Sequence, residues 1–269
     1  MPRVLGLHST VFDDVRALRT SAGRRERDRY AIEGPTLLAD ALAAGLEPEL
    51  VLATEAAFAR LPADLARRVE DRTALAAERA FARVSELETP PGILAVLPRR
   101  FAALDELLRS GEPALVLSGV ADPGNAGTLI RTAEIFGITR IVAARGGVEP
   151  HNPKLVRAAM GATFRVALAV ADPAELAVAA RAAGYTFVAT ATEGTPLPTV
   201  HFPRRALLAV GNERRGVAGW YPEHDLAVAI PQLGGGESLN AAIAGGIVLY
   251  VFSQQFVDTL GGPENGANP

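Results

Sequence analysis

The sequence of 269 residues contains no cysteine, and Lys154 is its single lysine. Without a thiol the chain cannot form disulfides, bind a metal through thiolates or use a cysteine nucleophile. Histidine is scarce too, and the four histidines are scattered along the chain without partners at the spacing of metal ligands: His8, His151, His201 and His224. We therefore expect no metal site, which argues against a metal hydrolase.

Long apolar runs are also missing. No run approaches the roughly 20 residues that span a membrane, and the chain does not begin with a charged and then apolar leader. We therefore expect a cytoplasmic protein with no membrane contact. A hydrophobic content of 49% in 269 residues is sufficient for a proper core, and this length favours one or two domains.

Strand-like and helix-like segments alternate along most of the chain. In residues 1–97 we expect a helix at 35–44 and strands at 49–53 and 93–97, followed by a hinge near Pro98 and a connecting helix at 99–109. The later part is more regular, with strands at 114–120, 140–144, 166–170, 186–191, 206–210 and 226–230 and helices at 126–137, 153–160, 173–183 and 238–256. This alternation predicts an α/β fold in which a parallel sheet carries helices on both faces. The tail 261–269 is rich in Gly, Asn and Pro, and we expect it to be disordered.

Three polar loops that contain glycine stand out in the later part. The first runs from Asp122 to Arg131, and the second, at 211–216, reads Gly-Asn-Glu-Arg-Arg-Gly; both follow apolar strands. The third has consecutive glycines at 234–236, followed by Glu237, Ser238, Leu239 and Asn240 at the start of a small-residue helix. Such glycines indicate a sharp bend or a close approach of the backbone to a ligand, and a helix start favours a polar or anionic ligand. Because ligands of open α/β sheets bind at the carboxyl ends of strands, the three loops predict one pocket.

These motifs resemble the SpoU, or TrmH, family of ribose 2′-O-methyltransferases of the SPOUT superfamily. The resemblance rests on Asn125-x-Gly-x-x-x-Arg131, then Gly211-x-Glu213-x-x-Gly216, then Ile230-Pro231 and Glu237-Ser238-Leu239-Asn240, in that order. It covers residues 110–255, and residues 29–45 resemble the small substrate-binding domain that often precedes such catalytic domains. The resemblance implies S-adenosylmethionine-dependent methylation of a ribose 2′-hydroxyl, either in 23S ribosomal RNA or in transfer RNA.

The resemblance also implies a domain plan and a topology that periodicity cannot show. Residues 1–97 would form a small α/β RNA-binding domain, and residues 98–260 a SPOUT catalytic domain whose parallel sheet contains a deep trefoil knot, a rare exception to unknotted topology. S-adenosylmethionine would sit in this knot, held largely by backbone groups. The lack of cysteine agrees with methyl transfer to an oxygen, which needs no cysteine adduct.

The matching motif positions supply the site residues that the resemblance implies. The cofactor-binding residues would be Gly211, Ile230, Leu239, Ser238 and Asn240, and the catalytic residues Arg131, Asn125, Glu213, Ser238 and Asn240. Asn125 and Asn240 would hold ribose or phosphate with help from Ser238, and Glu213 would fix Arg131 or its loop. A free guanidinium has a pKa above about 12. Arg131 is therefore either strongly perturbed and acts as the base, or it orients the hydroxyl while another group accepts the proton.

Each of these residues also has an ordinary structural alternative. Asn125 could be a helix N-cap, a position that asparagine favours. Glu213 could form a surface ion pair with a neighbouring arginine, and Ile230 and Leu239 could belong to the core.

Arginines are concentrated near the N-terminus, although the net charge of the chain is −3. The cluster comprises Arg16, Arg19, Arg24, Arg25, Arg27 and Arg29. Since guanidinium groups bind phosphate and stack on bases, we expect RNA contact from Arg24, Arg25, Arg27 and Arg29. The alternative is a solvated surface rich in arginine.

The last helix is apolar on more than one face, as expected for a helix buried in both a core and an interface. Its large apolar residues are Ile243, Ile247, Tyr250, Val251 and Phe252. The resemblance implies pairing of two chains through the knot region, so we expect a homodimer. Burial of this helix within one subunit is the alternative.

Two other classes of protein share the α/β alternation and have to be compared with the methyltransferase. A dinucleotide-binding oxidoreductase is disfavoured, because no Gly-x-Gly-x-x-Gly follows a strand. A non-catalytic RNA-binding protein of the same fold remains the alternative to the methyltransferase, and binding of S-adenosylmethionine would discriminate between them.

Overall fold

The computed structural model describes residues 2–6, 9–212, 216–217, 224–234 and 238–260. Contacts between residues divide the chain into two units. The first unit comprises Met1–Arg100 together with His151–Arg157, and the second comprises Phe101–Pro150 and Ala158–Pro269. The expected disordered tail at 261–269 lies outside the described residues.

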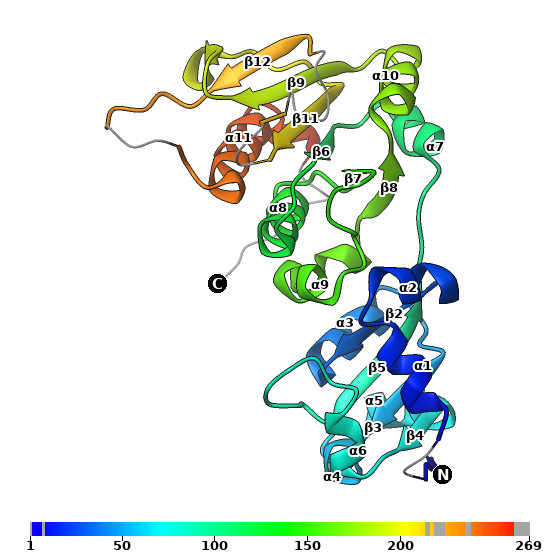
Figure 1. Ribbon diagram of the computed structural model, residues 1–269. Helices are drawn as coiled ribbons and strands as arrows, with labels where there is room; N and C mark the ends of the chain where they lie inside the picture. Colours follow the sequence, from blue (N-terminus) through cyan, green and yellow to red (C-terminus); the bar gives the residue numbers. More distant parts are fainter. Residues whose placement is uncertain (1, 7–8, 213–215, 218–223, 235–237, 261–269) are drawn as a thin grey trace. The chain divides into compact units, whose positions relative to one another are not determined.

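The first unit is built on a mixed sheet with the strand order β1-β4-β3-β5-β2 among the described residues (Figure 1). Strand β5 is antiparallel to its neighbours β2 and β3, whereas β3, β4 and β1 are parallel. The strands are β1 (Arg3–Val4), β2 (Arg29–Glu33), β3 (Leu50–Ala53), β4 (Thr73–Leu75) and β5 (Ile93–Pro98). The helices are α1 (Val11–Ala17), α2 (Ser21–Arg27), α3 (Pro35–Ala43), α4 (Glu55–Phe58), α5 (Ala63–Val69) and α6 (Glu78–Ala82).

An apolar stripe on α1 packs onto this sheet. Phe12, Val15 and Leu18 are spaced by three residues, so they share one side of the helix. They are buried in a core that also contains Leu52 of β3 and Leu94 of β5. The same spacing that marks an amphipathic helix in the sequence thus produces the packing.

The second unit is built on a wholly parallel sheet with the order β10-β12-β9-β11-β6-β7-β8 among the described residues. Its strands are β6 (Ala114–Ser118), β7 (Arg140–Ala144), β8 (Ala167–Ala171), β9 (Thr186–Ala191), β10 (Thr195–Pro196), β11 (Ala206–Gly211) and β12 (Leu226–Ala229). The helices that follow in chain order are α7 (Leu104–Arg109), α8 (Pro123–Ile135), α10 (Pro173–Ala182), α11 (Ala241–Gln255) and α12 (Val257–Leu260). Helix α9 (Pro153–Ala159) lies between β7 and β8 in the sequence, and most of it is grouped with the first unit.

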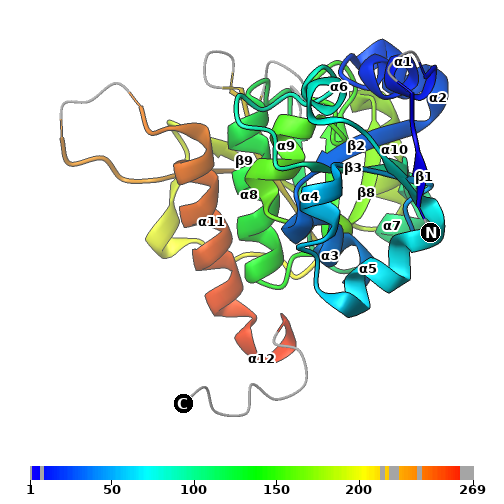
Figure 2. The ribbon, with the colours of Figure 1, turned by 90° about the horizontal axis from the view of Figure 1, so that it is seen from below.

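Helices cover both faces of the parallel sheet, as the sequence predicts. Side chains alternate along each strand, so Ala209 of β11 shares a core with Leu176 of α10, whereas its neighbour Val210 packs toward Gly245 of α11. On that second face α11 also contacts α8, where Leu129 lies against Gly245, and Figure 2 shows the two helices side by side. The α/β class with a parallel sheet is therefore confirmed.

Several element boundaries differ from those expected. Helix α7 begins at Leu104 rather than at residue 99, because Arg99–Ala103 run as an extended linker in which the Ala102 amide donates to the Leu168 carbonyl at 2.7 Å. Helix α8 begins at Pro123, because the Asp122 side chain caps it and proline is favoured in the first helical turn. Helix α11 begins at Ala241 rather than at 238, because Asn240 is its N-cap.

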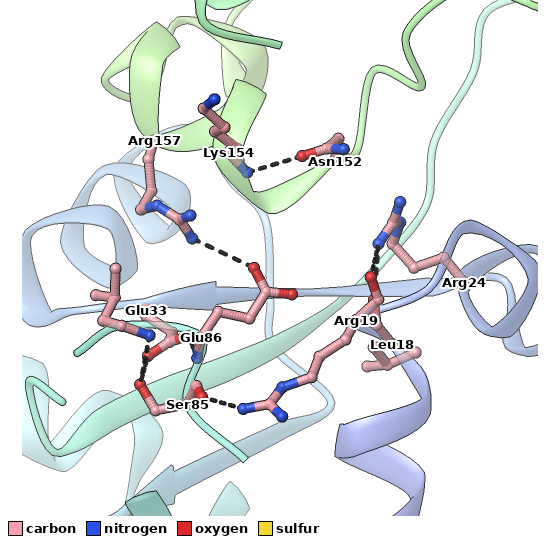
Figure 3. A network of polar contacts seen from close by, with 10 residues as sticks. Leu18, Arg19, Arg24, Glu33, Ser85, Glu86, Asn152, Lys154 and Arg157 are labelled. Atoms are coloured by element: carbon pink, nitrogen blue, oxygen red, sulfur yellow. Dashed lines mark hydrogen bonds and ion pairs between the residues drawn. The ribbon is translucent and has the colours of Figure 1, made fainter. Parts of the chain in front are cut away.

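Arg24 is buried, with 2% of its surface exposed. Its Nη1 donates to the carbonyl of Leu18 at 2.9 Å and to that of Arg19 at 3.0 Å, at the end of α1 (Figure 3). The last carbonyls of a helix have no intrahelical donor, and a positive charge there complements the helix dipole. Arg24 thus fastens α2 to the end of α1.

A buried carboxylate fixes the segment that follows α6. Glu33 at the end of β2 accepts from Ser85 Oγ at 2.5 Å and from the Glu86 amide at 2.8 Å. Arg19 donates to the Ser85 carbonyl, and Arg157 of α9 forms an ion pair with Glu86 at 3.7 Å (Figure 3). Charged hydrogen bonds therefore hold this irregular segment in place of regular secondary structure.

The segment that begins at His151 packs against β2. The rings of His151 and Tyr30 lie with their centroids 4.5 Å apart, and both side chains are buried. Burial, with the added effect of Arg99 and Arg24, lowers the pKa of His151 to about 3, so its imidazole is neutral in the folded protein.

We expect Arg24→Ala to lower the free energy of unfolding by about 2–3 kcal/mol, because two carbonyls in the interior lose a charged donor. The matched control is Arg25→Ala, since Arg25 is exposed on the same helix and donates to Ser21 Oγ; its effect should stay within about 0.5 kcal/mol. Denaturant unfolding monitored by circular dichroism measures both. Equal stability of the two variants would contradict the assigned role of Arg24.

Candidate functional site

Two of the predicted motifs meet at a single hydrogen bond. Asn240 Nδ2 donates to Asn125 Oδ1 at 3.1 Å, although the two residues are 115 positions apart in the sequence. Asn125 lies in the first turn of α8, which follows β6, and Asn240 is the N-cap of α11. The expectation that the first and third loops lie together is therefore confirmed by the geometry.

The orientation of the Asn240 amide is fixed by its capping role. Its Oδ1 accepts from the amides of Ala242 at 2.9 Å and Ile243 at 3.2 Å, so its Nδ2 is left to face Asn125. Asn125 itself is not the N-cap of α8: its backbone amide donates to Asp122 Oδ1 at 2.7 Å. The ordinary alternative for Asn125 is thus wrong, because Asp122 takes the capping position.

A cavity of about 400 Å³ opens beside this hydrogen bond at the carboxyl ends of β9 and β11. Four of the predicted cofactor residues line it, namely Gly211, Ile230, Ser238 and Leu239, whereas Asn240 does not. Further lining residues that the sequence analysis did not identify are Thr190, Thr192, Asn212, His224, Gln232 and Ala244. The size lies within the range of small-molecule sites.

The residues that line the cavity include both polar and apolar types. Leu239 is 41% exposed and Ile230 is half-buried, so Leu239 does not belong to the core and the ordinary alternative fails for it. An apolar side chain held open to solvent beside a cavity is suited to cover a flat apolar group of a ligand. His224, which is exposed, adds an imidazole to the lining.

Gly211 is required where β11 ends, because the chain folds back over it. A Cβ at this position would lie 2.1 Å from the carbonyl carbon of Gly216, and Asn212 and Gly216 form an isolated bridge. Gly234 differs, since a Cβ there would meet no heavy atom within 4 Å. Glu213, Glu237 and the glycines at 235 and 236 lie outside the described residues.

Arg131 is exposed on α8, six positions after Asn125. Its Nη1 donates to Met160 Sδ. Met160 is not among the residues expected at the site; its only signal in the sequence is that it is the one methionine besides Met1 and directly precedes a glycine. The proposed contact between Arg131 and Glu213 stays a prediction.

An apolar groove runs between α8 and α11, and among the described residues it shares no lining residue with the cavity. Its volume is about 520 Å³, and Asn125 and Asn240 lie among its lining residues. Three residues of α11 that line it are exposed, namely Ile243 (56%), Ile247 (36%) and Tyr250 (50%). Phe252 is fully buried instead, and its ring packs against Phe202 with a centroid distance of 5.4 Å. Phe252 therefore belongs to the core of the second unit, although the sequence placed it at an interface.

The four arginines expected to contact RNA have different environments. Arg24 is buried and caps α1, so a phosphate contact through it is not compatible with this structure. Arg25 and Arg29 are exposed, Arg27 is half-buried, and Arg29 pairs with Glu49 at 2.5 Å. RNA contact by Arg25, Arg27 and Arg29 stays a prediction.

The part of the chain that the structure describes contains no group of three or more His, Asp or Glu that could hold a metal ion. Within the same residues, none of the helices has both the length and the apolar character needed to cross a membrane.

Two regions of the chain match known protein families. Residues 112–250 match the SpoU rRNA Methylase family, and residues 13–95 match the MRM3-like substrate binding domain. The first region contains the cavity lining and the Asn240–Asn125 hydrogen bond.

Individual proteins and structures are similar over nearly the whole chain. The 23S rRNA (guanosine(2553)-2′-O)-methyltransferase RlmP of Bacillus subtilis is 32% identical over 240 residues, which cover 88% of this chain and 93% of that protein. The AdoMet-bound rRNA methyltransferase from Sinorhizobium meliloti has a TM-score of 0.84 at 28% identity, covering 95% of this chain and 98% of that chain. The SpoU methyltransferase AviRb from Streptomyces viridochromogenes, in complex with the cofactor AdoMet, has a TM-score of 0.82 at 27% identity, covering 93% and 99%.

We expect Gly211→Ala to lower the free energy of unfolding by about 3 kcal/mol, because its methyl group would overlap backbone atoms that cannot move aside cheaply. Gly234→Ala is the matched control, since the space around that position is open; we expect its effect to stay within about 0.5 kcal/mol. Thermal unfolding of both variants measures the difference. A Gly211→Ala variant as stable as the parent would show that the close approach at residue 211 is absent.

Proposed function

The chain belongs to the SpoU rRNA methylase family, and we propose that it transfers the methyl group of S-adenosylmethionine to a ribose 2′-hydroxyl of ribosomal RNA. The observation that carries the proposal is the Asn240–Asn125 hydrogen bond, because it joins two motifs beside a cavity of suitable size. The relatives with this activity and the AdoMet-bound structures support it.

The cavity fits S-adenosylmethionine in volume and in chemistry. Leu239 and Ile230 offer apolar surface for the adenine ring, and the backbone around Gly211 and Ser238 offers hydrogen-bonding groups for the polar parts. When bound, S-adenosylmethionine supplies a methyl group on a sulfonium, which is a good leaving group. The protein therefore contributes mainly by orienting the attacking hydroxyl.

Several residues around the Asn240–Asn125 hydrogen bond each contribute to orienting the attacking hydroxyl. Asn125 and Asn240 hold the ribose or its phosphate, and Ser238, at the cavity wall, helps to fix the sugar. Arg131, whose guanidinium offers donors and no acceptor, orients the 2′-hydroxyl and the adjacent phosphate through charged hydrogen bonds, and another group accepts the proton of the hydroxyl. Glu213, by its motif position, fixes Arg131 or its loop.

The first unit presents the RNA. Residues 13–95 match a substrate binding domain, and the exposed arginines of α2 and β2 are suited to phosphate contact. Specificity for a nucleotide resides in the shape of RNA loops and leaves no short motif in a sequence. Transfer RNA is therefore an alternative outcome of the experiment below. A cytoplasmic location remains an expectation from the sequence.

The deep trefoil knot and the homodimer are part of the same proposal. The knot is supported by the TM-score of 0.84 to a solved rRNA methyltransferase. The dimer is supported by the groove between α8 and α11, where Ile243, Ile247 and Tyr250 leave apolar surface exposed on α11. Because the other side of α11 belongs to the core, we infer that its exposed apolar side chains contact a second copy of this chain.

Mapping 2′-O-methylation in RNA from a strain that lacks the gene tests the function. We expect one ribosomal site to lose its methyl group and to regain it on complementation. A site that vanishes in transfer RNA would redirect the substrate assignment, and an unchanged methylation map together with no S-adenosylmethionine binding in calorimetry would favour a non-catalytic RNA-binding protein.

We expect Arg131→Ala to reduce methyl transfer by far more than tenfold, since a group central to the transfer is worth more than the roughly 1.4 kcal/mol that tenfold represents. Arg131 does not line the cavity, so its loss should leave the affinity for S-adenosylmethionine nearly unchanged. We expect a change of less than about twofold, or about 0.5 kcal/mol, in calorimetry. Arg109→Ala is the control, since Arg109 ends α7 just before β6 and thus lies at the opposite edge of the sheet. Arg131→Ala activity within tenfold of the parent would refute the role.

Light scattering at micromolar concentration should give a mass near twice 28.1 kDa. Tyr250→Asp should shift this mass toward 28.1 kDa with the fold retained, because Tyr250 is half exposed beside the groove. Val178→Asp is the control, since Val178 is 72% exposed on α10. A parent mass near 28.1 kDa would reject the dimer.

A further inference from the structure

Met160 holds an unusual backbone conformation. Its φ is +47°, and that of the following Gly161 is +80°. A positive φ is uncommon for residues other than glycine, because the Cβ then crowds the backbone and strains the conformation. Asp28, which also has a positive φ, is a short polar residue of the kind that tolerates this region, whereas a long apolar side chain gains no local hydrogen bond from it. The surrounding contacts must therefore maintain the conformation of Met160.

Those contacts connect the turn after α9 with α8 at two points. Met160 Sδ accepts from Arg131 Nη1, and one helical turn further along α8, Glu134 forms a two-pronged ion pair with Arg165, whose Nη2 lies 2.9 Å from Glu134 Oε2. Between these points Ala162–Phe164 form a short 3₁₀ helix that packs against α8. The backbone turn at residues 160 and 161 thus places one side chain beside the arginine at the site.

The chemistry of the thioether suits this position. The side chain of Met160 is 57% exposed, so burial of apolar surface does not account for its placement. A thioether sulfur is a weak acceptor without charge. It restricts the rotamers of Arg131 while leaving the full positive charge of the guanidinium for a phosphate, which a carboxylate in its place would neutralise.

We propose that Met160 is a positioning residue for Arg131, a role that rests on the proposed function. It holds the guanidinium in the orientation that methyl transfer requires, without competing for the RNA. Its loss should therefore reduce kcat and leave both the KM for RNA and the affinity for S-adenosylmethionine close to those of the parent.

Three variants separate this role from packing. Met160→Leu keeps the size and loses the acceptor, and we expect kcat to fall about fivefold to tenfold with KM within twofold. Met160→Gln restores a neutral acceptor, and kcat should return to within twofold of the parent. Met160→Glu pairs with Arg131 and should raise the KM for RNA more than tenfold. Val178→Leu, at an exposed position on α10, is the control and should behave like the parent.

A spectroscopic test needs no enzymatic activity. The chain contains two methionines, Met1 and Met160, so a protein labelled with ¹³C-methyl methionine gives two assignable methyl signals. Arg131→Ala should shift the Met160 signal and leave that of Met1 in place, whereas Arg109→Ala should shift neither. This measurement also applies if Met160→Leu folds poorly.

The outcomes distinguish this inference from the proposed function. If the parent methylates ribosomal RNA but Met160→Leu keeps its kcat within twofold, Met160 does not position Arg131. A Met160 methyl signal that does not respond to Arg131→Ala would overturn the contact itself. If the parent transfers no methyl group to any RNA while the Met160 signal responds, the contact stands, and the proposed function and the positioning role of Met160 both fail.

Discussion

The geometry of the site depends on one side-chain amide. Asn240 uses its carbonyl oxygen to cap α11 and its amino group to reach Asn125 on α8. Because the cap fixes which way the amide points, the helix start and the contact between loops are set by the same torsion angles. A residue with an acceptor alone could perform the first task and not the second. This double use joins the start of α11 to the first turn of α8, in addition to the packing of the two helices along their lengths.

The shape of the cavity depends on a glycine at the end of β11. Where β11 ends at Gly211, the returning chain passes 2.1 Å from the place where a Cβ would lie, so this part of the cavity wall has no room for a side chain and is main chain. A wall of this kind offers fixed amide and carbonyl groups and has no rotamers to order when a ligand binds. Among the apolar side chains of the lining, those of Leu239 and Ile230 are accessible to a ligand that enters the cavity.

The sequence was sufficient for the parallel sheet and for the residues that meet at its edge, because both leave local signals. Apolar strands end in glycine and polar residues, and the motifs fall at those ends. It was insufficient where the outcome depends on distant partners. The sequence of α2 does not show that Arg24 is buried while Arg25 is exposed. Arg24 is buried because it donates to carbonyls at the end of α1, and the sequence does not show that contact. Met160 and the extended linker before α7 depend likewise on contacts with segments far along the chain.

The assignment of residues 151–157 to the first unit has a consequence for how such proteins can be recombined. These residues are encoded between two strands of the second unit, yet His151 lies against Tyr30 and Arg157 against Glu86. A single cut in the gene near residue 100 would therefore leave residues 151–157 in the second fragment, without the residues of the first unit that they contact. Exchange of the leading domain between relatives, in nature or in the laboratory, has to carry this internal stretch along with it. The boundary between the two units is therefore discontinuous in the sequence, although each unit is built on its own sheet.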